Sequence, residues 1–279
     1  MSTWGIRPFF IRHLLVGCML LSGLWGCGPS TTEKLTLTGS STIAPLASEL
    51  AREFEARHPN VRVDVQTGGS SRGIADARSG VADIGMASRP LNGKEMDLFA
   101  HEIAYDGIAL ILNTENPVDQ LTDQDIVAIY SGEIDNWRLL GGPDQAITVV
   151  NKAEGRSTLE LFLKYFKLNN KQVKADIIIG DNQQGIKTVA GSPAAIGYVS
   201  IGTAEFEVSQ NTAIKILGLG GIAATISSVK SGDFPLSRPL NLVTSGPPEG
   251  WSKKFIEFAQ SDSVHSLVKN QFFIPVNAH

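Results

Sequence analysis

Two hydrophobic periods alternate along the first third of the chain. Apolar and polar residues alternate through 35–38 and 61–65, which predicts two short strands. Between them, apolar residues recur at helical spacing through 46–56, so an amphipathic helix is expected there. A second helix is predicted over 74–78 and a buried strand over 82–87. This order, with short connections, implies a parallel sheet covered by helices on both faces.

The middle of the chain also alternates predicted helices and strands, with fewer elements. Helices are predicted over 121–130, with Thr122 as its N-cap, and over 157–167. Strands are predicted over 146–150 and 194–200. These elements indicate a second α/β unit.

A long apolar strand predicted over 103–113, interrupted at Asp106, is expected to leave the first unit, and the strand over 194–200 to return to it. The later elements are assigned to the first unit: strands over 214–217 and 239–243 and a helix over 251–260. The predicted lobes are 35–114 with 200–279, and 115–199. Two such lobes joined by two crossings leave a cleft at the carboxyl ends of the strands, where ligands bind in sheets of this kind.

Three hydroxyl-rich loops precede predicted helices, at 39–45, 68–73 and 154–158. A helix N-terminus offers unpaired backbone N–H groups and the positive end of the macrodipole, so an anion can bind there. One such loop is a weak signal, because Ser and Thr are also ordinary N-caps. Three of them, far apart in the sequence, suggest one oxyanion held from several sides, which favours a binding protein over an enzyme.

The N-terminus has the pattern of an export signal. Arg7 and Arg12 precede an apolar run over 14–24, which is too short to span a bilayer. The run ends before Cys27, and this resembles a bacterial lipoprotein signal in which that cysteine is lipidated. Residues 1–27 are therefore predicted to be the signal peptide and 28–34 a flexible linker.

Two alternatives to this leader remain open. Cys18 fits the local lipoprotein pattern better than Cys27, but Arg12 and His13 leave almost no apolar run in front of it. Simple secretion, with cleavage nearby, is the other. Each alternative places the protein outside the cytoplasm.

Composition narrows the function further. Both cysteines, Cys18 and Cys27, lie in the leader, so the folded part has no disulfide or thiolate metal site. Removing residues 1–27, which hold two arginines and no acidic residue, leaves 22 basic against 28 acidic residues and a formal net charge of −6. That balance argues against nucleic-acid binding or a polybasic membrane surface.

Several segments together resemble the substrate-binding proteins of phosphate ABC transporters. They are GSSTIAPLA (39–47), TGGSSRGIADARSGVADIGMASRPL (67–91), DGIALILNTENPV (106–118), IYSGEIDNW (129–137), NKAEGRST (151–158), AIGYVS (195–200) and FPLSRPLNLV (234–243). The resemblance covers nearly all of the mature chain and implies the two-lobed α/β type II periplasmic-binding-protein fold. Each lobe would be a mainly parallel sheet flanked by helices, with two hinge crossings.

The resemblance also implies a function. Phosphate, or a similar tetrahedral oxyanion, would be captured in the periplasm and passed to ABC permease subunits by a monomer attached to the membrane only through its lipid. No cofactor, metal or nucleic acid is expected, and no catalysis. An envelope sensor or interaction protein that uses the same lobe closure remains an alternative.

The family's ligand contacts transfer by motif to hydroxyls and cations at the helix starts. The implied ligand-binding residues are Ser41, Thr42, Ser70, Ser88, Arg89, Arg156, Ser157 and Thr158. This chain departs from the family at two places. Lys152 stands where an arginine is usual, so Arg156 is expected to supply the main cation. Arg89 stands where the best-known receptors have the acid that accepts the proton of hydrogen phosphate.

Three further residues are candidates, and two of them have more than one interpretation. Arg72 either lies at the rim of the site or pairs with a nearby carboxylate such as Asp76 or Asp83, and pairing with a carboxylate is also the alternative for Arg89. Asp106 is either a satisfied turn residue or the missing proton acceptor. Lys152 is a secondary cation candidate, while Arg238, between a serine and a proline, is interpreted as structural.

Overall fold

The computed structural model describes residues 32–276. The predicted signal peptide, Cys27 and most of the linker lie outside the described residues. No helix among those described is long and apolar enough to cross a membrane.

The first lobe is built on five neighbouring strands in the order β2 (Val61–Thr67), β1 (Glu33–Gly39), β3 (Ile84–Ala87), β9 (Ser237–Thr244) and β4 (Phe99–Asn113). The predicted parallel pairing is confirmed for β1 with β2 and β3, whereas β9 runs antiparallel to both β3 and β4. The short strand β10 (Ile274–Pro275) pairs with β4 near its middle. The long strand β4 continues beyond this sheet.

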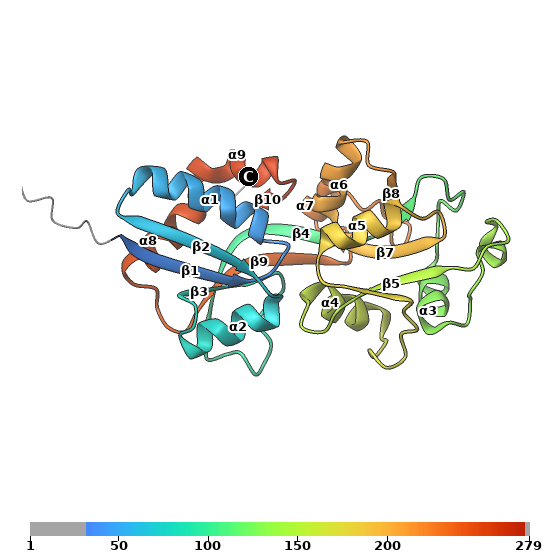
Figure 1. The fold of residues 1–279 in the computed structure, drawn as a ribbon, viewed down its shortest axis with the longest axis horizontal. Helices are drawn as coiled ribbons and strands as arrows, with labels where there is room; N and C mark the ends of the chain where they lie inside the picture. Colours follow the sequence, from blue (N-terminus) through green and yellow to red (C-terminus); the bar gives the residue numbers. More distant parts are fainter. Residues whose placement is uncertain (1–31, 277–279) are drawn as a thin grey trace, which may run out of the picture. The chain divides into compact units, whose positions relative to one another are not determined.

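Helices cover both faces of this sheet, as the alternating pattern predicts. Helix α1 (Ala44–Arg57) packs with α8 (Gly250–Ala259) and α9 (His265–Asn270) over one face, and their apolar side chains share one core cluster. Helix α2 (Ser70–Ser79) lies on the other face (Figure 1). A single 3-10 turn, Asp262–Val264, joins α8 to α9.

The second lobe extends from the other half of β4. Strands β7 (Ala195–Ser200) and β8 (Ile214–Leu217) both pair antiparallel with it, and β5 (Thr148–Lys152) lies parallel to β7 and to β6 (Ile177–Ile179). The flanking helices are α3 (Asp123–Ser131), the 3-10 turn Trp137–Leu140, α4 (Ser157–Phe166), α5 (Asn182–Ala190), α6 (Ile201–Ser209) and α7 (Ile226–Lys230).

The predicted N-cap of α3 is confirmed. The Thr122 hydroxyl accepts the backbone N–H of Asp125 at 3.1 Å, and the Asp125 carboxylate accepts the backbone N–H of Thr122 at 2.8 Å. This reciprocal pair satisfies donors that a helix start would otherwise leave unpaired.

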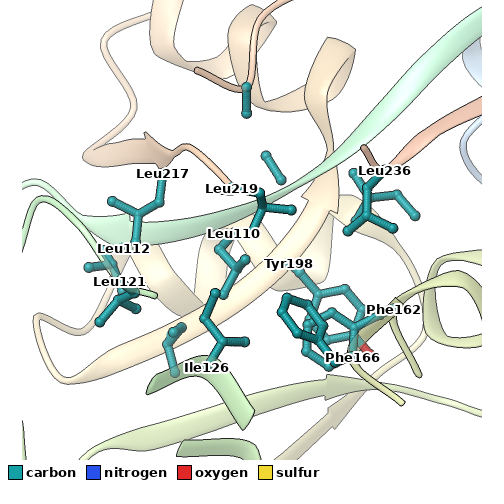
Figure 2. Close-up of a cluster of buried hydrophobic side chains, with 14 of the residues drawn as sticks. Leu110, Leu112, Leu121, Ile126, Phe162, Phe166, Tyr198, Leu217, Leu219 and Leu236 are labelled. Atoms are coloured by element: carbon teal, nitrogen blue, oxygen red, sulfur yellow. The ribbon is translucent and has the colours of Figure 1, made fainter. Parts of the chain in front are cut away.

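The core of the second lobe combines aromatic and aliphatic side chains from distant segments (Figure 2). Phe162 of α4 stacks on Tyr198 of β7, with ring centroids 4.0 Å apart and planes 6° from parallel. Leu110 of β4 and Leu217 of β8 belong to the same buried cluster. Tyr198 is therefore a packing residue, as is the buried Trp137, whose indole N–H donates to the Ala194 carbonyl at 2.9 Å.

The lobe boundaries differ from those expected at one place. Strand β7 pairs with residues 108–112 of β4 and does not return to the first lobe, and β8 pairs with residues 110–113 beside it. The segment that was assigned to the first lobe, 200–236, instead supplies Leu217, Val229 and Phe234 to the second-lobe core. The reason is that the apolar half of β4 needs cover, and these side chains provide it. The return crossing is β9.

Close backbone approach fixes the start of α2 against the sheet. A Cβ atom on Gly73 would lie 2.5 Å from the Thr38 carbonyl oxygen and 2.7 Å from the Gly39 Cα. A Cβ atom on Gly85 would lie 2.4 Å from the Gly73 carbonyl oxygen. Only glycines allow this spacing, and it holds the N-terminus of α2 beside the end of β1.

The substitution Gly73→Ala tests this packing. Because backbone atoms meet the added methyl group, the helix must shift, and we expect the free energy of unfolding to fall by about 1–3 kcal/mol. Gly93→Ala is the matched control, since its Cβ would have no atom within 4 Å. Urea denaturation of both variants measures the difference, and equal stability of the two would contradict the packing argument.

Candidate functional site

The helix-start loops meet at one edge of the two sheets. Strand β1 runs into the Ser40–Ile43 turn before α1, β2 into Gly69 before α2, and β3 into Ser88. In the second lobe, β5 leads through Arg156 into α4, and β6 leads through Asp181 into α5. The carboxyl ends of parallel strands therefore bring hydroxyls from both lobes together.

A buried ion pair lies at the centre of this edge. Arg238 of β9 and Asp106 of β4 stand opposite each other in the antiparallel register, and both side chains are 0% exposed. Arg238 Nε and Nη2 donate to Asp106 Oδ2 at 3.1 and 2.8 Å. The other carboxylate oxygen accepts the N–H of Gly202, in the first turn of α6, at 3.2 Å. Asp106 is thus the counter-ion of Arg238, and it lies within strand β4 rather than in a turn.

The remaining N–H groups of Arg238 reach hydroxyls of both lobes. Nη1 donates to Thr158 Oγ1 at 3.1 Å and to Ser88 Oγ at 3.4 Å, and Nη2 donates to Thr42 Oγ1 at 3.3 Å. Thr42 and Ser88 belong to the first lobe and Thr158 to the second. Beyond the structural role expected from the sequence, Arg238 is the cation around which the predicted hydroxyls gather. We call these four residues the Arg238 cluster.

Two more serines support the Arg238 cluster from the first lobe. Ser70, one of the implied ligand-binding residues, accepts the Ser88 backbone N–H through its Oγ at 3.2 Å. Ser40, which the sequence analysis missed, donates to Ser88 Oγ at 3.0 Å and accepts the N–H groups of Thr42 and Ile43. Ser41 is not hydrogen-bonded to the cluster and lines a groove beside it. Ser40 and Ser41 are adjacent in the motif, so the sequence alone does not show which of them faces the Arg238 cluster; the backbone turn decides it.

The second lobe contributes further polar groups. Ser157 and Thr158 are buried at the start of α4. Ser157 Oγ and Arg156 Nε are buried and form no hydrogen bond with any described residue. The Arg156 side chain lies across from Gly69, where a Cβ atom would be 3.0 Å from Arg156 Cδ. Ser157 Oγ and Arg156 Nε can therefore form hydrogen bonds with a ligand at the start of α4, where the sequence predicts ligand contacts.

Lys152 is buried behind the hydroxyls and does not contact them directly. Its Nζ donates to the Asp181 carbonyl at 2.8 Å and to Asn182 Oδ1 at 3.0 Å. Burial lowers the pKa of Lys152 to about 7, with Asp181 acting in the opposite direction. Its link to the Arg238 cluster passes through Asn182, whose Nδ2 donates to Thr42 Oγ1 at 3.4 Å. Asn182 had no local signal in the sequence.

Arg89 is occupied by carboxylates. Its Nη1 and Nη2 donate to Glu95 at 2.7 and 2.9 Å, and its Nε lies 2.6 Å from Glu160 Oε2. Although burial opposes the charged form, these two acids raise the pKa of Arg89 above its usual value. The guanidinium is therefore already paired with carboxylates, and the binding of ligand by Arg89 stays a prediction.

Arg72 pairs with Asp76 at 3.2 Å, and its side chain is 58% exposed. In the structure Arg72 therefore pairs with a nearby carboxylate, which is one of its two interpretations.

The Arg238 cluster is suited to binding rather than to covalent chemistry. A guanidinium balanced by Asp106 offers fixed donors, and serine and threonine hydroxyls can each donate and accept. Such donors around a buried point match a tetrahedral oxyanion. Among residues 32–276, no group of three or more His, Cys, Asp or Glu side chains could hold a metal ion.

Comparisons with known proteins identify the family of this chain. The model of the PBP superfamily domain matches residues 28–263. The phosphate-binding protein PstS of Bacillus subtilis is 30% identical over 247 residues, covering 87% of this chain and 80% of that protein. A structure from Clostridium perfringens, described as a phosphate ABC transporter substrate-binding protein with bound phosphate, is 33% identical with a TM-score of 0.81, covering 88% of this chain and all of that one.

A second solved structure, an ABC-type phosphate transport receptor from Vibrio cholerae, is 31% identical with a TM-score of 0.71 and covers 86% of this chain and 99% of that one. The expected fold is confirmed by these matches. This chain therefore belongs to the family of phosphate-binding proteins within the PBP superfamily and has the type II periplasmic-binding-protein fold.

Proposed function

We propose that this protein captures phosphate outside the cytoplasm and delivers it to the permease of an ABC transporter. One observation carries the proposal: a single buried guanidinium is hydrogen-bonded to hydroxyls of both lobes, at 3.1–3.4 Å. The relatives that match most of the chain are named phosphate-binding proteins, and this supports the same ligand here.

The proposed ligand contacts come from the helix starts and from β9. They are Thr42, Ser70, Ser88, Arg156, Ser157, Thr158 and Arg238. At neutral pH phosphate carries a proton that must be accepted, and sulfate carries none. Because Asp106 faces Arg238, we assign that acceptor role to the cluster's hydroxyls, which can receive a hydrogen bond as well as donate one.

Binding would be coupled to lobe closure. A ligand that contacts Thr42 and Ser88 from one lobe and Thr158 from the other has its full set of contacts only when the lobes are together. Its differential affinity for that arrangement would shift the population toward the closed form. Closure would then give the permease a signal that the site is loaded.

Isothermal titration calorimetry with phosphate, sulfate, molybdate and tungstate tests the ligand. We expect phosphate to bind most tightly, because only a protonated tetrahedral anion uses both the donor and the acceptor capacity of the hydroxyls. Tighter binding of sulfate or of a metal oxyanion would contradict phosphate as the ligand. Absence of binding to all four would contradict the proposed function.

Replacing Arg238 tests the identity of the main cation. Arg238→Lys retains a charge beside Asp106, but the three N–H groups of an ammonium leave one nitrogen and cannot reach Asp106 and three hydroxyls at once, so we expect phosphate affinity to fall by more than tenfold. Arg72→Ala is the control, since that exposed side chain lies outside the Arg238 cluster. If Arg156→Ala weakens binding more than Arg238→Lys does, the main cation is Arg156, as the sequence analysis expects.

We further propose that the protein is anchored by lipid on Cys27, which lies outside the described residues. Cys27→Ser is then expected to move the protein from the membrane fraction to the soluble fraction, because no described helix spans a membrane. Cys18→Ser is the matched control and should leave the distribution unchanged. Fractionation and immunoblotting of both variants measure this; release by Cys18→Ser alone would assign the anchor to Cys18.

A further inference from the structure

A groove of about 380 Å³ runs beside the Arg238 cluster. Residues of both lobes line it, among them Ser41 and Thr67 from the first and Asp181, Asn182, Gln183 and Thr203 from the second. Its volume lies at the small end of the range for small-molecule pockets, roughly 300–1,000 Å³. Asp181 is the charged residue of this lining and none of the described lining residues is Lys or Arg, so the groove offers no side-chain cation to a second anionic group.

Asn182 belongs to both the groove and the hydrogen-bond network of the Arg238 cluster. Its Nδ2 donates to Thr42 Oγ1 at 3.4 Å, and Thr42 Oγ1 accepts from Arg238 Nη2 at 3.3 Å. The route from the groove to the buried guanidinium therefore passes the Asn182 amide. Asn182 is only 5% exposed, and its amide contacts Thr42 on the side of the Arg238 cluster while the residue lines the groove.

The orientation of the Asn182 amide is fixed from behind. Lys152 Nζ donates to Asn182 Oδ1 at 3.0 Å, and this places the carbonyl end of the amide away from the cleft. The Nδ2 end then faces the cleft, where Thr203 Oγ1 lies at 3.3 Å as a second acceptor. Lys152 is 2% exposed and also held by the Asp181 carbonyl, so this support is rigid.

We propose that Asn182 is the residue that restricts the site to unsubstituted oxyanions, by separating the Arg238 cluster from the groove. The inference rests on the proposed function. An oxygen atom of a bound phosphate next to Thr42 would face the Asn182 amide, so an alkyl group on that oxygen would collide with it. Without the side chain, the cluster and the groove would form one continuous site for a small phosphate monoester.

Competition binding measures this selectivity directly. The probes are inorganic phosphate, methyl phosphate and glycerol 1-phosphate, titrated against wild type, Asn182→Ala and Asn182→Ser. We expect wild type to prefer phosphate over both esters by at least a hundredfold, and each variant to lower that ratio by at least tenfold. Gln183→Ala is the matched control, because Gln183 lines the same groove but hydrogen-bonds outward to Glu207 at 2.8 Å.

The possible failures are distinguishable. Wild type that binds the esters as tightly as phosphate, or variants that bind phosphate with an unchanged ratio, would overturn the role of Asn182 while the proposed function stands. An equal change in Gln183→Ala would overturn it too, because the effect would then belong to the groove in general. Wild type that binds neither phosphate nor ester would contradict the proposed function and this inference together. Thermal unfolding of each variant confirms that the ratio is measured on folded protein, and Asn182→Ser provides the measurement if Asn182→Ala does not fold.

Discussion

The ion pair between Arg238 and Asp106 is the interaction on which the site depends. Removing two charges from water costs several kcal/mol per ion, and such a pair persists only where further hydrogen bonds complete both partners. Here the Gly202 N–H completes Asp106, and three hydroxyls complete Arg238. The β4–β9 register places the two residues opposite each other, and a slip of one strand by one residue would turn its side chain to the other face of the sheet, away from its partner. The pairing of β4 with β9 therefore fixes both the crossing between the lobes and the position of the buried cation.

On the α2–α4 side of the cluster, the lobes meet through a second set of polar contacts. Glu160 of α4 accepts Ser71 Oγ at 2.8 Å and lies 2.6 Å from Arg89 Nε, and the Ser71 backbone N–H donates to the Gly155 carbonyl at 3.2 Å. Polar contacts of this kind give little net stability at a partly exposed surface, yet they are directional. They define how the two lobes fit together on this side of the Arg238 cluster.

The sequence predicts what is local and misses what depends on distant pairing. Hydrophobic period identifies α1 and β2, and Thr122 marks the capped start of α3. Clustered hydroxyls indicate the edge of the sheet where an anion is expected to bind. The sequence does not show that Arg238 is buried, because its partner Asp106 lies 132 positions away and nothing in the surrounding Ser-Arg-Pro segment marks it as buried. Of the two partners of Arg89, Glu95 lies only six positions away, whereas Glu160 is brought to it only by the fold. The strand β8 was recognised, but its lobe depends on which half of β4 remains uncovered.

A chain with more acidic than basic residues can hold an anion because the field at a buried site is set by the nearest groups. Asp106 neutralises most of the charge of Arg238, so the site does not present a bare cation that would attract any anion indiscriminately. What remains is a set of oriented N–H and O–H dipoles at the helix starts, whose strength depends on position. Lys152 adds a positive charge that is partial near neutral pH, since burial lowers its pKa to about 7. Selection among anions by this protein is therefore a matter of shape and hydrogen-bond direction, and the groups that set direction, such as the Asn182 amide, matter as much as those that carry charge.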